Sequence, residues 1–246
     1  ADGRGREGDR GPAGEVERAG RAAARRGALL QTVREVVHGR GLVGPRPVGR
    51  DVETGIDRDG DPDLTAELPA QALIGAEARD FGVYIHVPFC RVRCGYCDFN
   101  TYTAEELGGV SRSSYAGEVE KEMAIAERVL AGSPRQVSTV FFGGGTPTLL
   151  PVSDLAAMLD GVRSRWGLAP DAEVTVEANP DSVGERELAQ LREAGVTRVS
   201  FGMQSAVPHV LAVLERTHDP ARIPIVVAAA KRVGLEPSLD LIYGTP

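Results

Sequence analysis

From Phe81 onward, short apolar runs rich in β-branched and aromatic residues alternate with longer segments in which apolar residues recur every three or four positions. Gly, Pro, Asn or Ser closely follows each short run, which is typical of strands that end in loops. Each longer segment carries one apolar stripe, which predicts an amphipathic helix. The predicted strands span residues 82–87, 137–142, 173–178, 197–203 and 237–243, and the predicted helices lie at 115–130, 155–166, 188–191, 207–214 and 223–233.

Local signals also predict where some helices begin. Thr103 with Glu106, and Ser182 with Glu185, have the spacing of a capping box, in which two side chains satisfy the first free amides of a helix. The dipeptide at 219–220 is Asp-Pro, which suits an N-cap followed by the first helical position.

The order of these elements indicates the fold class, α/β. Strand and helix repeat about five times, which calls for a parallel sheet with right-handed crossovers, either a barrel or a doubly wound sheet. A cysteine-rich loop follows the first strand instead of a G-x-G-x-x-G dinucleotide fingerprint, and this favours the barrel. Because the chain ends directly after the fifth strand, we expect a partial (β/α) barrel truncated after about five βα units, with an exposed edge strand.

The first 78 residues have a different character. Gly, Arg, Asp and Pro dominate, and one short helix is possible around residues 15–37. Such a segment has too little apolar surface to offset the entropy of ordering it. We therefore predict a low-complexity or disordered extension over 1–78 and a core domain over 79–246, with a functional arm as the alternative for the extension.

Composition narrows the function classes. The 246 residues carry a formal net charge of -7 with a pI of about 5.3, and the charges are intermixed, which disfavours a nucleic-acid binder. No run approaches the roughly 18–20 apolar residues that cross a bilayer, and no early apolar segment resembles a secretory signal. These features predict a cytoplasmic protein without a membrane span.

All three cysteines lie in one short segment, Cys90-x3-Cys94-x2-Cys97. A disulfide would leave one thiol unpaired and close a very small loop, so metal ligation is the better interpretation. Three thiolates on a four-iron cubane leave one iron open for a ligand. A zinc site completed by His86, or three unconnected thiols, would have the same spacing, and the spacing alone does not decide between them.

Polar residues at the strand ends form a second group of candidates. Glu177 ends the third strand, Gln204 follows the fourth, and Asp240 lies on the fifth. In barrels the carboxyl ends of the strands meet at one face, where active sites form. We therefore expect these three side chains to converge, although each one alone could be an ordinary structural or surface residue.

Five segments, taken together, resemble a known family. They are YIHVPFCRVRCGYCDFNTY (84–102), FFGGGTPT (141–148), VEANP (176–180), SFGMQS (200–205) and DLIYGTP (240–246). In this order they resemble the motifs of the radical S-adenosylmethionine (SAM) coproporphyrinogen III oxidase-like family, which includes HemN enzymes and HemW haem chaperones. The resemblance spans residues 81–246 and excludes the first 80.

The resemblance implies a 4Fe-4S cluster whose open iron binds the amino and carboxylate groups of SAM, and whose electron cleaves SAM to methionine and a 5'-deoxyadenosyl radical. His86 is assigned a packing or supporting role, and no role is given to His218. As metal ligands, the resemblance implies Cys90, Cys94 and Cys97. As SAM-site residues, the resemblance implies Tyr84, Gly144, Gly145, Thr146, Glu177, Gln204, Arg216 and Asp240.

Two functions remain within this family. The oxidase subgroup has a loop that resembles Cys-x3-Cys-x2-Cys-x-Cys, whereas this sequence has Phe99 at the position of the fourth cysteine. The segment CDFNTY looks like that of the chaperone subgroup. The resemblance therefore favours a chaperone that binds haem and delivers it to a client protein, over an oxygen-independent oxidase that decarboxylates coproporphyrinogen III. A third alternative is another radical SAM enzyme acting on a tetrapyrrole. Each of these three functions implies haem or another tetrapyrrole as the ligand, and an electron donor such as a flavodoxin or ferredoxin. The sequence assigns no catalytic residues.

Overall fold

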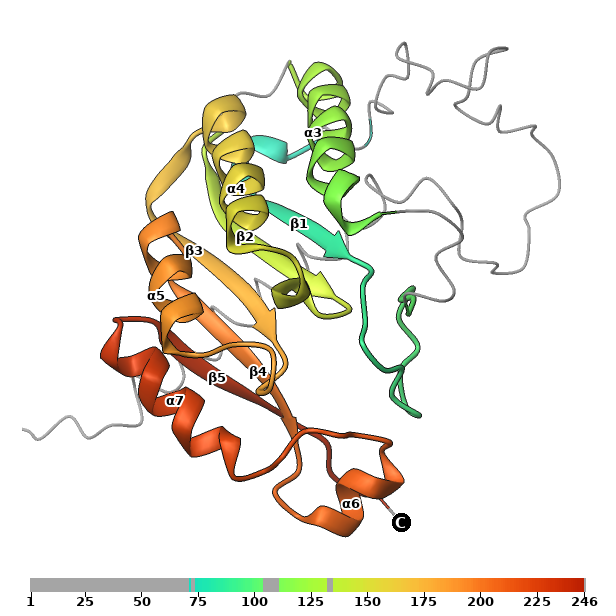
Figure 1. Cartoon of the computed structure of the whole chain (residues 1–246). Helices are drawn as coiled ribbons and strands as arrows, with labels where there is room; N and C mark the ends of the chain where they lie inside the picture. Colours follow the sequence, from blue (N-terminus) through green and yellow to red (C-terminus); the bar gives the residue numbers. More distant parts are fainter. Residues whose placement is uncertain (1–70, 72–73, 104–110, 132–134, 246) are drawn as a thin grey trace, which may run out of the picture. The chain divides into compact units, whose positions relative to one another are not determined.

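The computed structural model describes residues 71, 74–103, 111–131 and 135–245 (Figure 1). The predicted extension therefore lies almost wholly outside the described residues, as do its possible helix and Glu106 of the first predicted capping box.

Five parallel strands form one sheet, as the sequence predicts. They pair in the order β1-β2-β3-β4-β5, so every strand lies beside the next strand of the chain. A doubly wound sheet would reverse its strand order partway, and this sheet does not, so the sequential winding is that of a barrel wall. The strands are β1 (Phe81–Val87), β2 (Val137–Gly144), β3 (Leu168–Ala178), β4 (Arg198–Gln204) and β5 (Glu236–Leu241).

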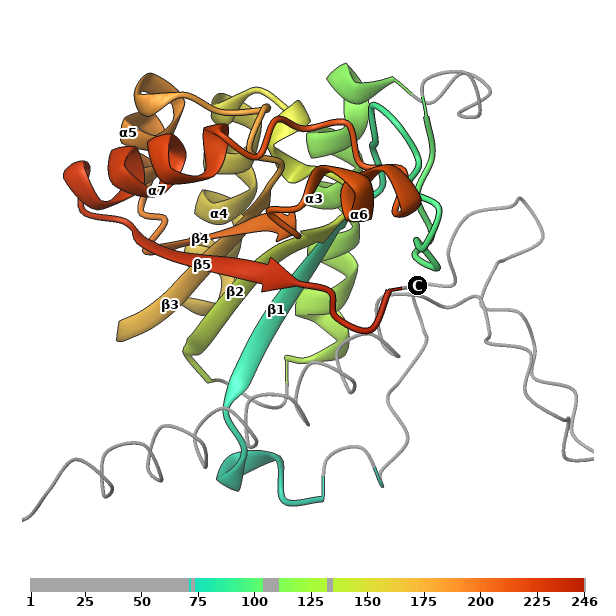
Figure 2. The same ribbon diagram turned by 90° about the horizontal axis from the view of Figure 1, so that it is seen from below.

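The helices that connect the strands cover one face of the sheet (Figure 2). Residues from four of them share one apolar cluster with the strands, which is the expected result of right-handed crossovers in sequence. In the described ranges, no helix combines the length and apolarity required of a membrane span. The helices are η1 (Ala76–Ala78), α3 (Arg112–Val129), η2 (Pro147–Leu149), α4 (Val152–Trp166), α5 (Glu185–Ala194), α6 (Pro208–Val213) and α7 (Arg222–Arg232).

The two faces of the sheet differ in chemistry because side chains alternate along each strand. On the helix-covered face, Val140, Val176 and Phe201 are at most 1% exposed and pack with Leu159 of α4 and Leu188 of α5. Burial of each such side chain contributes roughly 1.5–3 kcal/mol relative to leaving it in water. The opposite face carries polar side chains from all five strands. The candidate site lies at the carboxyl ends of these strands.

Two predicted helix starts are wrong in detail. Ser182 does not cap α5, because its hydroxyl donates to the carbonyl of Asn179 and shares a hydrogen bond with Thr148. The Glu187 carboxylate instead accepts from the amide of Gly184, the residue before the helix. The helix α7 begins two positions after Pro220, at Arg222.

Candidate metal centre

The cysteine loop is closed at its base by backbone pairing. The amide of Cys90 donates to the carbonyl of Tyr102 at 2.9 Å, and the amide of Tyr102 donates to Pro88 at 2.8 Å. Between them, Phe89 is 1% exposed and packs edge-on against the ring of Tyr115 in α3, with 5.2 Å between ring centroids. The loop therefore starts and ends at one anchored point of the fold, so that its cysteines are held together.

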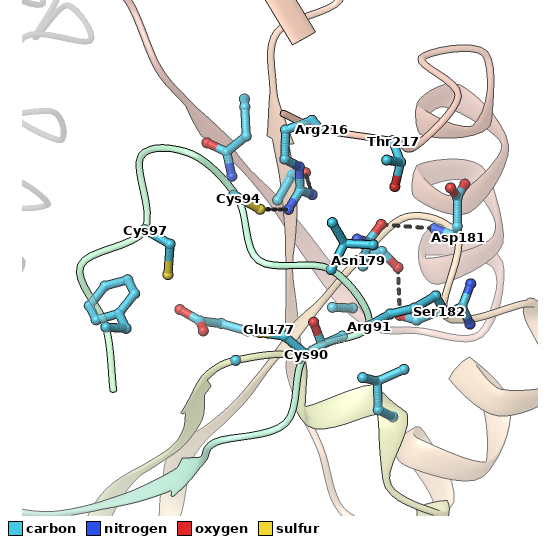
Figure 3. A pocket seen from close by; sticks show the side chains of 18 of the residues that line it. Cys90, Arg91, Cys94, Cys97, Glu177, Asn179, Asp181, Ser182, Arg216 and Thr217 are labelled. Carbon is cyan, nitrogen blue, oxygen red and sulfur yellow. Dashed lines mark hydrogen bonds between the residues drawn. The ribbon is translucent and has the colours of Figure 1, made fainter. Parts of the chain in front are cut away.

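Inside the loop, Cys90, Cys94 and Cys97 all line one pocket (Figure 3). The amide of Cys97 donates to the carbonyl of Cys94 at 3.0 Å, which makes a tight turn between the two ligands. Burial raises the pKa of the Cys90 thiol; a hydrogen bond from Thr101 partly offsets this, and the charges of the other two thiolates raise the pKa further. The neighbouring thiolates thus disfavour ionisation of the Cys90 thiol, and a bound metal would offset this effect and release the Cys90 proton.

The arrangement of the thiols bears on which metal they fit. In the described part of the chain, no three His, Cys, Asp or Glu side chains converge closely enough to hold one metal ion. A cubane separates its ligands more widely than a single zinc ion does, because each thiolate binds a different iron. The pocket that the three cysteines line is partly open to solvent, so a ligand can reach it.

The glycine loop after β2 packs directly on the start of the cysteine loop. The amide of Gly145 donates to the carbonyl of Val87, and the amide of Thr146 donates to Phe89, both at 2.7 Å. A Cβ atom on Gly145 would lie 2.5 Å from the carbonyl oxygen of Phe89. Gly144 has φ +111°, and a Cβ there would lie 2.6 Å from the ring of His86. Glycine is therefore required for this close backbone approach.

Glu177 faces the glycine loop from the end of β3. Its Oε2 accepts from the amide of Gly144 at 3.1 Å. Burial raises the pKa of this carboxyl to about 7; the Gly144 amide lowers it, and the negative charge of Asp240 raises it. Near neutral pH, Glu177 therefore exchanges between its charged and protonated forms, whereas most carboxyls are fully charged.

The raised pKa of Glu177 predicts a pH dependence in the cluster-free protein. Between the ordinary value of 4.5 and about 7, the folded protein keeps a proton that the unfolded chain has lost. The free energy of unfolding should therefore fall as pH rises through this window and level off above it, by up to about 3 kcal/mol for this one group. Thermal unfolding at pH 5 and pH 8 measures this difference. Glu177→Gln should reduce it, and an identical pH response in both proteins would refute the assignment.

Arg216 reaches the cysteine loop from the far end of the chain. The helix α6 ends in a Schellman motif, in which the Arg216 amide donates to Leu211 and the Glu215 amide donates to Ala212. Glu215 adopts φ 53° at the position usually taken by glycine. The turn directs the Arg216 guanidinium into the pocket, where Nη1 donates to Cys94 Sγ at 3.4 Å and Nη2 donates to the carbonyl of Gly202 at 2.6 Å.

His86 lies beneath the cysteine loop. Its Nε2 is 2.8 Å from the carbonyl oxygen of Asn100, which can only accept, so this nitrogen carries the proton. The other nitrogen, 3.1 Å from the Tyr84 hydroxyl, is then the acceptor. Tyr84 also stacks on Phe141, with 6.0 Å between ring centroids. His86 thus links β1 to the cysteine loop in a supporting position.

The pocket brings together most residues that the sequence singles out. Gln204, at the end of β4, adopts φ 61°, a costly conformation for a residue with a side chain. Tyr84 and His86 are both absent from the pocket lining; the Tyr84 hydroxyl pairs with His86, which in turn pairs with Asn100 of the cysteine loop. The predicted residues that line the pocket are Cys90, Cys94, Cys97, Gly144, Gly145, Thr146, Glu177, Gln204, Arg216 and Asp240.

Several lining residues were not predicted. Asn179, Asp181 and Ser182 follow directly after β3, and Thr217 follows Arg216 (Figure 3). Their position after a strand end was a usable signal, because the same criterion selected Glu177. Glu215 gave no comparable signal, since its place depends on the turn after α6.

Comparisons with known proteins agree with this geometry. The family model described as the radical SAM superfamily matches residues 84–246. The heme chaperone HemW of Mycobacterium tuberculosis is 50% identical over 181 residues, covering 73% of this chain and 45% of that protein. The HemW of Escherichia coli is 38% identical over 169 residues, covering 67% and 43%.

A solved structure is similar as well. Coproporphyrinogen III oxidase (HemN) from Escherichia coli, a radical SAM enzyme, matches with a TM-score of 0.62 and 29% identity, covering 73% of this chain and 42% of that chain. The chain thus spans somewhat less than half the length of the relatives that it matches.

Proposed function

Because the chain belongs to the radical SAM superfamily, whose members use a 4Fe-4S cluster and SAM, we propose that it is the SAM-binding part of a HemW-type haem chaperone. In this proposal the whole protein binds haem and delivers it to a client protein, and an electron donor such as a flavodoxin or ferredoxin reduces its cluster. We also keep as proposals the cytoplasmic location, the extension over 1–78 and the core domain over 79–246.

One observation carries the proposal for the cofactor site. Three thiols from one loop line a single pocket with the glycine loop and with Glu177, at the ends of parallel strands. The thiols of Cys90, Cys94 and Cys97 would hold three irons of the cluster. When bound, the cluster supplies the electron that cleaves SAM, and the protein holds the reactants in place.

The other residues have chemistry that suits the two ends of the SAM methionine group. Glu177 can accept a hydrogen bond from an ammonium group, and it already lies against the amide of Gly144. Arg216 can hold a carboxylate through two parallel hydrogen bonds. In the described structure the guanidinium donates to Cys94 and Gly202, so it already sits between the cysteine loop and β4. Gly145, Thr146, Gln204 and Asp240 complete the proposed SAM site.

Phe99 favours the chaperone over the oxidase. Phe99 stands where the Cys-x3-Cys-x2-Cys-x-Cys pattern of the oxidases has its fourth cysteine. The residue is 51% exposed. Relatives named HemW match this chain at 50% and 38% identity. The similarity to the solved HemN structure supports the alternative, an oxygen-independent coproporphyrinogen III oxidase.

One experiment separates these two functions. The full-length protein is reconstituted with iron and sulfide without air, and haem retention and coproporphyrinogen III decarboxylation are both measured. The chaperone proposal predicts stoichiometric haem retention and no decarboxylation. Robust decarboxylation without haem retention would establish the oxidase instead.

A further inference from the structure

A row of hydrogen-bonded side chains crosses the polar face of the sheet and ends at Asp240. Arg198 and Ser200 lie on β4, and Ser238 and Asp240 lie on β5, with Ser200 paired to Ser238 in the strand register. The distances are 3.3 Å from Arg198 Nε to Ser238 Oγ, 2.9 Å from Ser238 Oγ to Ser200 Oγ, and 2.9 Å from Ser200 Oγ to Asp240 Oδ1. We call these four residues the polar row.

The chemistry of the two ends fixes the direction of every hydrogen bond. A carboxylate accepts and does not donate, so the single proton of the Ser200 hydroxyl goes to Asp240. Ser200 must then accept from Ser238. The Ser238 hydroxyl has then donated its own proton and accepts from Arg198, whose guanidinium can only donate. The polar row therefore runs one way, from a permanent positive charge to the carboxylate.

The start of the polar row is fixed by a second set of contacts. Arg198 Nη1 lies 3.6 Å from Glu173 Oε2, and the hydroxyl of Thr175 donates to the other oxygen of Glu173 at 3.1 Å. Thr175 is 2% exposed and Ser200 is 7% exposed, so the middle of the sheet holds these groups rigidly. Asp240 itself is exposed, so it depends on the row to hold its side chain in one orientation.

The hydrogen bond from Ser200 determines which oxygen of Asp240 can meet a ligand. One of its oxygens, Oδ1, is committed to Ser200, and this leaves Oδ2 as an acceptor for a ligand in the pocket that Asp240 lines. A carboxylate held in place before the ligand arrives loses less entropy on binding.

We propose that Ser200, directed by Ser238 and Arg198, is a positioning residue that holds the Asp240 carboxylate ready to accept a hydrogen bond from SAM. The identity of the ligand rests on the proposed function. The polar row acts on SAM through Asp240 and does not touch the ligand itself. Removing the Ser200 hydroxyl should therefore weaken SAM binding without affecting the cluster.

The test measures the dissociation constant of SAM by equilibrium dialysis on the reconstituted full-length protein. Ser200→Ala should weaken binding about three- to tenfold, since the hydrogen bond to a charged group is lost but water can partly replace it at exposed Asp240. Ser200→Thr keeps the hydroxyl and should restore most of the affinity. Ser153→Ala, at an exposed position at the start of α4, is the matched control and should leave affinity unchanged. Iron content should be the same in all four proteins.

A double-mutant cycle with Asp240→Ala shows whether Ser200 acts through Asp240. Once the carboxylate is gone, adding Ser200→Ala should weaken SAM binding no further. An equal loss with and without Asp240 would overturn the proposal, and so would an unchanged affinity in Ser200→Ala. If the unsubstituted protein retains a cluster but does not bind SAM, the proposed function itself fails, which is a separate and recognisable result.

Discussion

Cys94→Ala is expected to remove iron-sulfur absorbance and SAM binding together. Two remaining thiolates cannot hold a cubane stably, and without the open iron the SAM amino and carboxylate groups lose their proposed anchor. Cys94 is also the thiol that accepts from Arg216, so its loss frees the guanidinium proposed to bind the SAM carboxylate. Visible absorbance, iron content and SAM dialysis of the anaerobically reconstituted full-length protein measure the effect.

The same measurements on Ser153→Ala give the control for this prediction. Ser153 lies on α4, with its hydroxyl 3.3 Å from the carboxylate of Asp154, and is exposed, so its removal should leave cluster and SAM binding unchanged. A normal cluster spectrum in Cys94→Ala would show that this thiol is not a ligand. Cluster loss with undiminished SAM affinity would show that SAM binds elsewhere.

Gly145→Ala is expected to damage both stability and cluster binding. The added Cβ would lie 2.5 Å from the carbonyl oxygen of Phe89, a backbone atom that cannot rotate away. The segment before Cys90 must therefore shift, at a cost of about 2–3 kcal/mol in the free energy of unfolding. Denaturant unfolding of the cluster-free protein measures that cost, and iron content after reconstitution should fall as the Cys90 thiol moves.

Gly117→Ala is a matched control for this substitution. Gly117 lies inside the helix α3, and a Cβ there would meet no atom within 4 Å. Alanine should stabilise the helix by about 0.5–1 kcal/mol and leave iron content unchanged. If Gly145→Ala were as stable as Gly117→Ala and held as much iron, the close packing of the two loops would not matter for the site.

The strands β1 to β4 could be predicted because each combines an apolar helix-covered face with a loop signal at its end, whereas β5 was predicted from its sequence pattern although none of its residues is buried. The exact first and last residues of the strands were harder to predict from the sequence. The strand β2 runs on to Gly144 because His86 pairs with Gly143 and Val87 pairs with Gly144, a backbone pairing without an apolar signature. The strand β3 begins at Leu168, where it pairs with Val137, well before the apolar run that predicts it.

The convergence of Glu177, Gln204 and Asp240 followed from topology alone, since the carboxyl ends of parallel strands meet at one edge. The contact between Arg216 and Cys94 did not, because it joins residues 122 positions apart and depends on the turn that ends α6. The wrong capping box has a similar cause. Ser182 had the right spacing for a cap, but its hydroxyl was engaged by Asn179 and Thr148, and Thr148 is distant in the sequence.

The direction of the hydrogen bonds in the polar row also could not be predicted from the sequence. Nothing in the sequence indicates that Ser200 of β4 pairs with Ser238 of β5. The register that places them opposite each other is a property of the folded sheet. Sequence patterns thus indicated at which end of the sheet these side chains gather, and their role in binding a cluster and SAM stays a prediction. The hydrogen bonds that orient its side chains required the three-dimensional structure.

We propose that the thiolates of Cys90, Cys94 and Cys97 hold a cluster with one iron open to SAM. Electron paramagnetic resonance of the reduced, anaerobically purified full-length protein tests it most directly, with spectra taken before and after SAM is added. We predict an iron-sulfur signal that changes when SAM binds the open iron. A signal that SAM leaves unchanged, or a silent protein carrying zinc on the same three sulfurs, would contradict the claim.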